Sequence, residues 1–164
     1  MAVSKSLALL GLFCFLGVAY GEVVTFQACP DETREDGSVV APRCEVHELR
    51  ITPCAEAAEN KPCKVKRGRA ASIEFDFTVA ATLHNATSRA YWANDMTDLP
   101  LVGMDTNSCG YTACPIQANA RQAFAQSLPL SKKFPVRTYD VKWRLTNEEE
   151  GVKCCFIFKI KLVK

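Results

Sequence analysis

The sequence is poor in the motifs by which enzymes are recognised. It has two histidines in 164 residues and no GxSxG, HExxH, P-loop or GxGxxG motif. His47 and His84 have no recognisable nucleophile to act on, so surface positions explain both. The sequence therefore indicates a protein that is not an enzyme and that carries no cofactor.

Long apolar runs are scarce as well, and the single clear one lies at the start. Residues 1–21 contain one lysine, Lys5, then an apolar run over 7–18, then Ala19 and Gly21 as small residues at the usual cleavage positions. This pattern is typical of a secretory signal peptide, and the run is too short to span a membrane. We therefore expect residues 22–164 to form one exported domain, extracellular or lysosomal in its final location.

Charge of one sign does not dominate the chain. The formal net charge is +2, with 20 basic and 18 acidic residues, so nothing in the overall charge points to nucleic acid. One local cluster is basic: Lys64, Lys66, Arg67 and Arg69. It is explained either by a polar strand edge that discourages aggregation or by a surface for an anionic membrane or an acidic partner.

Cysteine, in contrast, is abundant. Nine are present, and Cys14 falls within the expected signal peptide, which leaves eight: Cys29, Cys44, Cys54, Cys63, Cys109, Cys114, Cys154 and Cys155. An even number in an exported chain predicts disulfides. A metal site built from Cys109 and Cys114 is the competing interpretation, but no CxxC occurs and neither histidine has ligand spacing. We therefore expect no metal.

Alternation of apolar and polar residues with period two predicts β-strands that have one buried face. It occurs over 24–26, 73–79, 139–145 and 156–163, and is weaker over 45–52 and 88–93. Turn-forming segments at 30–42, 53–62, 98–105 and 147–151 separate these runs. About seven short strands without a long amphipathic helix predict an all-β, antiparallel sandwich. Asn119–Gln126 disagrees, because its composition favours a short helix.

Large apolar residues recur on the inward parity of several expected strands: Phe75, Phe77, Trp143, Phe156 and Phe158. Loops add further apolar residues, among them Leu101, Leu130 and Phe134. Composition alone favours a filled interior over a hollow one, because native interiors are densely packed.

An ordered set of short sequence words resembles the ML lipid-recognition domain, whose members include the soluble Niemann-Pick type C cholesterol-transfer protein, its insect relatives and the mite group-two allergens. The match extends over essentially all of residues 22–164, and its words are Val24–Cys29, Ile51–Cys54, Lys61–Gly68, Asp105–Cys109, Cys114–Ile116, Leu128–Leu130, and Trp143 followed twelve positions later by Cys155. The resemblance implies an immunoglobulin-like β-sandwich with an apolar cavity between the sheets. It also implies a strand, and not a helix, over Asn119–Gln126, and we follow it there.

Disulfide pairing is implied by the same resemblance. The family frame has six cysteines, and it pairs Cys29 with Cys155, Cys54 with Cys63, and Cys109 with Cys114. Cys44 and Cys154 are left over, and their pairing is a hypothesis. Residues 30–43 look like an insertion relative to the family frame.

The lipid-binding residues implied by the resemblance are all apolar. Leu101, Leu130 and Phe134 line the tunnel in the family, with Phe124, Trp143 and Phe156 as neighbours, and the inward parity adds Phe75 and Phe158. Leu130 and Phe134 depart from the family residues at the entrance, where Leu130 replaces a smaller branched residue and Phe134 an aromatic that carries a hydroxyl. Cholesterol is therefore not assured as the ligand.

The function expected from this resemblance is a monomeric, secreted lipid carrier that binds a sterol, a fatty acid or a similar hydrophobic molecule, with an anionic membrane or a lipid-accepting receptor as partner. The alternatives are a secreted immune module that binds a microbial glycolipid or a protein, and a carrier of semiochemicals. Asn85-Ala86-Thr87 is a glycosylation sequon in an expected loop.

Overall fold

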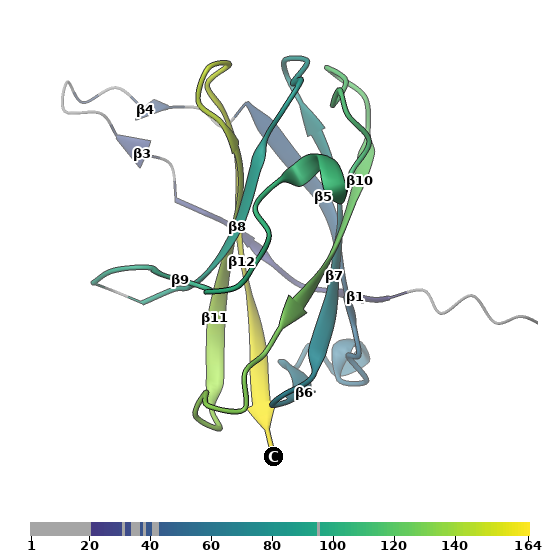
Figure 1. Cartoon of the computed structure of the whole chain (residues 1–164), viewed down its shortest axis with the longest axis vertical. Helices are drawn as coiled ribbons and strands as arrows, with labels where there is room; N and C mark the ends of the chain where they lie inside the picture. Colours follow the sequence, from purple (N-terminus) through teal and green to yellow (C-terminus); the bar gives the residue numbers. More distant parts are fainter. Residues whose placement is uncertain (1–20, 31, 34–36, 38, 41–42, 95) are drawn as a thin grey trace, which may run out of the picture.

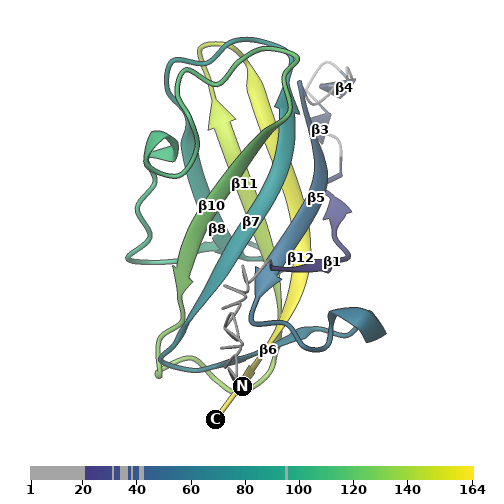
Figure 2. The ribbon, with the colours of Figure 1, turned by 90° about the vertical axis from the view of Figure 1, so that its right-hand side faces the viewer.

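The chain folds into two packed β-sheets, which stand as two layers in Figure 1. The structure is a computed structural model that describes residues 21–30, 32–33, 37, 39–40, 43–94 and 96–164. The expected signal peptide, apart from Gly21, lies outside the described residues. Figure 2, a quarter turn away, shows β5, β7 and β10 of one sheet in front of β8, β11 and β12 of the other.

The first sheet has four strands in the order β1-β5-β7-β10, and its neighbours are antiparallel. Its strands are β1 (Glu22–Val24), β5 (Cys44–Thr52), β7 (Ala70–Val79) and β10 (Gln122–Pro129). The predicted strands 45–52 and 73–79 are thereby confirmed.

The second sheet follows the order β2-β12-β11-β8-β9, and β6 pairs with β12 beside β2. Its strands are β2 (Gln27–Ala28), β6 (Cys63–Lys66), β8 (Thr87–Trp92), β9 (Leu99–Pro100), β11 (Thr138–Asn147) and β12 (Val152–Val163). The predicted strands 88–93, 139–145 and 156–163 lie in β8, β11 and β12, so they are confirmed apart from Ala93, which follows the end of β8.

Shorter elements fill the expected turn segments. Within 30–42, β3 (Glu32–Thr33) pairs with β4 (Val39–Val40) as a separate two-stranded sheet. The 3₁₀ turn η1 (Ala57–Glu59) lies in 53–62, and η2 (Ser108–Gly110) follows β9. The expected turn at 147–151 contains Gly151 at φ +60°, a backbone conformation that glycine adopts without strain.

Two expectations about strands need correction. The predicted strand over 24–26 is broken, because β1 ends at Val24 in the first sheet and β2 begins at Gln27 in the second. Thr25 and Phe26 carry the chain across the edge between the two sheets. The pairing is also not purely antiparallel, since β6 runs parallel to β12 after the chain has passed from β5 to the other sheet through η1.

The strand implied by the resemblance near Asn119–Gln126 is confirmed from Gln122 onward, and the helical preference of this segment is overridden. Asn119 has a φ of +56°, and β10 then pairs with β7 along its full length, from Gln122–Phe77 to Pro129–Ala70. Tertiary pairing outweighs a helix propensity that amounts to a few tenths of a kcal/mol per residue.

The core lies between the two sheets and follows from the period of two. Alternate residues of β7, β11 and β12 are buried, and the residues between them face outward. The fully buried aromatic residues from both inner faces are Phe75, Phe77, Phe124, Trp143 and Phe156.

Candidate functional site

The predicted tunnel residues lie on the inner faces of the two sheets and in the loops that adjoin them. Phe75 and Phe124 come from β7 and β10 of the first sheet, and Trp143, Phe156 and Phe158 come from β11 and β12 of the second. All five are buried. The predicted residues of the two sheets therefore converge on one apolar interior.

Four of these rings form a central aromatic cluster that spans the space between the sheets: Phe75, Phe124, Trp143 and Phe156. The centroid of the Phe75 ring lies 4.8 Å from that of Phe124, 5.0 Å from that of Phe156 and 6.1 Å from that of Trp143. The indole nitrogen of Trp143 donates to Ser88 Oγ at 2.8 Å, which fixes the orientation of the ring. At this level the space between the sheets is filled by the protein's own side chains.

A second aromatic group, the end cluster, lies at one end of the sandwich and consists of Trp92, Phe134 and Tyr139. The Trp92 ring lies 5.1 Å from that of Phe134 and 4.5 Å from that of Tyr139. Phe134 is half-buried, whereas Leu101 and Leu130, the other two predicted entrance residues, are buried. Sequence reasoning missed Trp92, although its spacing from Ser88 and Ala90 on β8 gives it the inward parity.

One edge of the sandwich is closed by an irregular stretch, residues 101–116, which we call the edge segment. Three backbone hydrogen bonds join it to β8 or to the residue before β8: Leu101 N to Ala90 O (2.9 Å), Ser88 N to Thr106 O (2.9 Å) and Ser108 N to Ala86 O (3.1 Å). The backbone N–H of Ala90 also points at the sulfur of Met104, 3.2 Å away.

The other side of the edge segment is bound to β10 of the first sheet. The contacts are Ala125 N to Tyr111 O (2.9 Å), Thr112 Oγ1 to Ala123 O (2.8 Å) and Gln126 Nε2 to Asp105 O (2.7 Å). The edge segment thus connects the two sheets where no strand of one pairs with a strand of the other.

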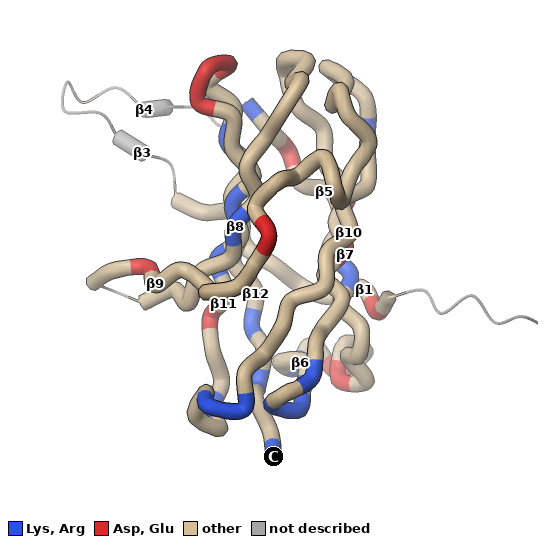
Figure 3. Tube along the Cα trace, in the orientation of Figure 1, with Lys and Arg blue, Asp and Glu red and all other residues tan. Residues whose placement is uncertain are grey.

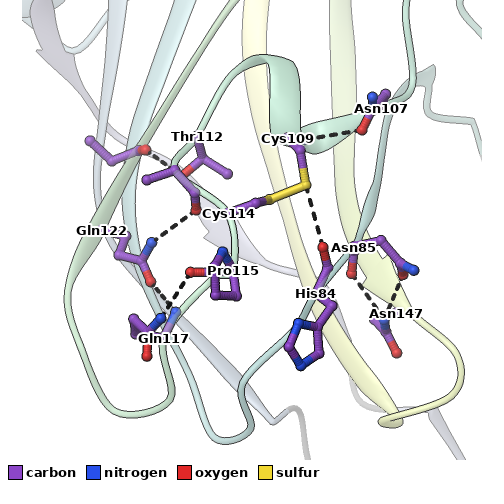
Figure 4. Close-up of a disulfide and its surroundings, with 12 residues drawn as sticks. His84, Asn85, Asn107, Cys109, Thr112, Cys114, Pro115, Gln117, Gln122 and Asn147 are labelled. Atoms are coloured by element: carbon purple, nitrogen blue, oxygen red, sulfur yellow. Dashed lines mark hydrogen bonds between the residues drawn. A yellow bond between two sulfur atoms is a disulfide. The ribbon is translucent and has the colours of Figure 1, made fainter.

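A disulfide between Cys109 and Cys114 lies within the edge segment. Figure 4 shows the bridge between Gln122 on one side and Asn85 and Asn147 on the other. Its Cys109 sulfur lies 3.7 Å from the carbonyl oxygen of His84, but an oxidised sulfur has no hydrogen to donate. The bridge closes a loop of only five residues' separation, so it constrains the edge segment without joining the sheets.

The opposite edge is closed by covalent bonds between distant parts of the chain. Cys44 on β5 is joined to Cys154 on β12, which links the two sheets with a Cα–Cα distance of 5.0 Å. Cys29, just after β2, is joined to Cys155. A fourth bridge joins Cys54 to Cys63. The structure therefore contains the three pairs that the resemblance implies and the additional pair between the two leftover cysteines.

Polar side chains interrupt the apolar interior where β10 meets the edge segment. Gln126 is 4 % exposed, and the Tyr111 hydroxyl donates to Asp105 Oδ2 at 3.1 Å. Partial burial of its phenol raises the pKa of Tyr111, and the adjacent Asp105 carboxylate raises it further. Sequence reasoning missed these residues, although Gln126 has the same parity as Phe124 and Leu128.

The basic cluster lies at the end of the molecule beside the end cluster. Figure 3 shows Lys and Arg gathered at this lower end, near β6. Arg67 is partly buried, and its Nη1 donates to the carbonyl oxygen of Phe134 at 2.9 Å. Lys64 pairs with Glu56 at 3.1 Å. Lys66, Arg69, Lys132 and Lys133 are exposed, so the loop that carries Phe134 is flanked by cations.

A groove of about 240 Å³ lies at the disulfide-closed edge, between the β1–β2 crossing, η1 and β12. Its walls include Val24, Phe26, Pro62, Ile157 and Phe158. Of the predicted tunnel residues only Phe158 lines it, so this groove is distinct from the predicted tunnel.

The eight cysteines form disulfides, which removes them as thiolate ligands, and the described part of the chain has no group of three or more His, Cys, Asp or Glu placed to hold a metal ion. Within that same part, no helix has the length and apolar character needed to span a bilayer.

The Asn85 side chain, in the expected glycosylation sequon, is exposed just before β8. Its Oδ1 accepts a hydrogen bond from Asn147 Nδ2 at 3.1 Å, which leaves the Asn85 nitrogen, the atom that a glycan would modify, outside this contact.

Both the sequence and the fold match known proteins. The family model of the ML domain matches residues 23–162. An MD-2-related lipid-recognition protein of Manduca sexta is 37 % identical over 122 residues, which cover 74 % of this chain and 78 % of that protein. NPC intracellular cholesterol transporter 2 of Mus musculus is 22 % identical over 141 residues, 85 % of this chain and 90 % of the relative.

A solved structure has the same fold. The crystal structure of a Niemann-Pick type C2 protein from the Japanese carpenter ant superposes with a TM-score of 0.68 at 16 % sequence identity. The superposition covers 85 % of this chain and 99 % of the ant protein.

Proposed function

Because the chain belongs to the ML domain family, we propose that it is a secreted, non-enzymatic carrier that takes one sterol, fatty acid or similar lipid between its two sheets. Membership of this family supports lipid binding or transport in general. The observation that carries the finer proposal is the apolar interior, which the two sheets share and which the edge segment covers along one side. Export agrees with four disulfides, which persist in oxidising compartments.

Uptake requires the central aromatic cluster to rearrange, since its rings occupy the space that a lipid would take. The β8–β10 edge is where the sheets can part, because hydrogen bonds of the edge segment hold it and none of the four disulfides joins the sheets there. A lipid that buries about 17 methylenes gains roughly 14 kcal/mol, before the costs of ordering and of moving these rings reduce it. Such a gain is large enough to favour a minor, open conformation.

The entrance that we propose is the end cluster with Leu101 and Leu130. Phe134 is the half-buried member of this group and lies on a loop, so it can rotate without disturbing a strand. Arg67 holds the backbone of that loop, and the surrounding Lys66, Arg69, Lys132 and Lys133 are exposed. An anionic membrane that attracts these cations would bring the entrance close to the lipid donor or acceptor.

The test is to narrow the entrance with Phe134→Trp and to use Val136→Trp as the control. Val136 lies in the same loop and is exposed, so the added indole stays in solvent. Uptake of a fluorescent sterol or fatty acid should fall at least about tenfold in Phe134→Trp and remain unchanged in Val136→Trp. Equal uptake by both variants would contradict the proposed entrance. Leu130→Trp provides a second test at the buried side of the same entrance.

The carrier function itself is tested by native mass spectrometry of protein purified from its source. A carrier should retain a lipid whose mass identifies it after extraction. Protein that carries no lipid and takes up neither a sterol nor a fatty acid would refute the proposal.

A second candidate function, a recognition module that contacts a protein, is favoured by one observation. Met96 and Val102 are 94 % and 91 % exposed, and Leu99 between them is exposed as well, on the loop around β9 that projects from the sandwich in Figure 1. Exposed apolar side chains that lie close together are typical of contact surfaces. If this function holds, Met96→Ser with Val102→Ser should abolish binding to the partner protein and leave lipid uptake unchanged.

A further inference from the structure

Gln126 is the buried polar residue on the inner face of β10. It follows Phe124 and precedes Leu128 on the buried side of β10, and it lies opposite Ile73 of β7. Only 4 % of its surface is exposed. An amide in this position faces the interior that we propose for the lipid.

One half of this amide is satisfied and the other half is not. Its Nε2 donates to the backbone oxygen of Asp105 at 2.7 Å, whereas its Oε1 is buried and has no hydrogen-bond partner among the described residues. Nearly all buried polar atoms in native proteins have a partner, and leaving one unpaired is costly. The bond to Asp105 also fixes which end of the amide is free, because only the nitrogen can donate to a carbonyl oxygen.

The surroundings define which chemical group would satisfy this oxygen. Oε1 is an acceptor only, so the complementary group must carry a hydrogen. The Asp105 carboxylate nearby already receives the hydroxyl of Tyr111, and a second carboxylate brought beside it would be repelled. Ser108 of the edge segment is also fully buried, and its Oγ likewise has no partner in the described part of the chain.

We propose that Gln126 Oε1 accepts a hydrogen bond from the hydroxyl group of the bound lipid, so that the protein selects an uncharged lipid alcohol, such as a sterol or a long-chain alcohol, over an ionised fatty acid. This inference rests on the proposed carrier function and names the ligand class that the same interior takes. Gln126 then acts as a specificity residue, and the apolar interior supplies most of the affinity.

The structure also offers a purely structural role, in which Gln126 does no more than tie β10 to the edge segment through Asp105. The two roles differ in what they predict for ligands. A structural tie affects every lipid alike, whereas an acceptor distinguishes a ligand that has a hydroxyl hydrogen from a ligand of the same shape that lacks it.

The experiment measures displacement of a fluorescent apolar probe by 1-hexadecanol, its methyl ether and palmitate at neutral pH, and by cholesterol and its methyl ether. The wild-type protein should bind each alcohol about fivefold to tenfold more tightly than its ether, and should bind 1-hexadecanol at least about tenfold more tightly than palmitate. Equal affinity for an alcohol and its ether would overturn the inference without any variant being made.

Variants then identify the residue. Gln126→Met keeps the length of the side chain and should reduce the preference for alcohol over ether to near unity. Gln122→Met is the matched control, because Gln122 lies on the same strand and also binds the edge segment, but its oxygen already accepts from the backbone of Gln117. A preference that persists in Gln126→Met, or that falls equally in both variants, would overturn the assignment to Gln126.

The same data separate the two proposals. If none of the five ligands displaces the probe, the carrier function fails, and the inference about Gln126 fails with it. If ligands bind without any preference for the alcohol, the carrier function stands and the specificity proposed for Gln126 is wrong.

Discussion

The two long edges of the sandwich are closed in different ways. At the β5–β12 edge, Cys44 and Cys154 join the sheets covalently, and the chain itself crosses from β1 to β2. At the β8–β10 edge, the edge segment joins the sheets through hydrogen bonds and buried apolar contacts. In our proposal the second edge is the side that opens.

Removal of the disulfides should show the largest difference between the edges. Cys44→Ala with Cys154→Ala leaves Cys29–Cys155 closed, so the loop that it releases has about 16 residues (15 from Cys29 to Cys44 and one from Cys154 to Cys155), for which the loop-entropy relation gives about 3 kcal/mol. Cys109→Ala with Cys114→Ala removes a bridge between cysteines that are five residues apart, for which the same relation gives a stabilisation of about 2 kcal/mol. Urea denaturation of each double variant measures both values. Equal losses would mean that the edges do not differ in this way.

The outer face of the first sheet carries a charge network that connects the two edges, and it should give a smaller, pH-dependent effect. Asp76 receives hydrogen bonds from Arg50 on β5 and from Arg121 beside β10, both at 2.7 Å. The hydrogen bond from Arg50 is the main reason that the pKa of Asp76 lies below its ordinary value of 3.8. The ionised carboxylate therefore stabilises the fold above that value, and this contribution is lost as the pH falls through the lower, folded pKa.

Accordingly, Asp76→Asn should reduce the free energy of unfolding by about 1–2 kcal/mol at neutral pH. The difference from wild type should persist in mildly acidic solution and shrink as the pH falls below 3.8, through the lowered pKa of the folded state. Denaturation midpoints measured across this range provide the test. A difference of the same size at both extremes would show that the charge of Asp76 is not its cause.

Hydrogen exchange should sharpen the comparison at the level of single amides. The amides of Ser88, Ser108 and Ala125 bind across the β8–β10 edge, whereas that of Cys29 binds Cys155 at the covalently closed edge. We expect exchange at least about tenfold faster for the first three, because their protection requires only a local opening of the edge segment. NMR-detected exchange resolves each amide. Slower exchange at Ser88 and Ala125 than at Cys29 would reverse the proposed roles of the edges.

The smallest effect is expected at Asn85, beside the edge segment. Asn85→Gln should remove a glycan, seen as a mass shift that treatment with an N-glycosidase reproduces in the wild-type protein. Because Asn85 is exposed, stability should change by less than about 0.5 kcal/mol. Identical masses before and after treatment would show that the sequon is not used.

The strands that form the centre of each sheet were the predictable part of the fold. In β7, β11 and β12 one face is buried and the other is solvated, so apolar and polar residues alternate along the sequence of each strand. The crossing at Thr25 and the parallel pairing of β6 were not predictable, because both depend on which distant strand lies alongside. β10 required the family resemblance, since its local composition favours a helix.

The site was predictable in its apolar part for the same reason. Phe75 and Trp143 belong to strands whose inward parity is evident, whereas Trp92 lies at the end of a weakly patterned strand. Gln126 could not be recognised, because its unpaired oxygen depends on a contact with Asp105 that only the folded edge segment creates.

Because Cys154 and Cys155 are adjacent and have different partners, correct disulfide pairing depends on the register of β12. Consecutive strand residues face opposite sides of a sheet, so Cys154 is buried between the layers while Cys155 points away from them. If the two exchanged partners, β12 would slide by one position and turn Phe156 and Phe158 toward water. Correct pairing of both bridges therefore requires the apolar side of this strand to face inward.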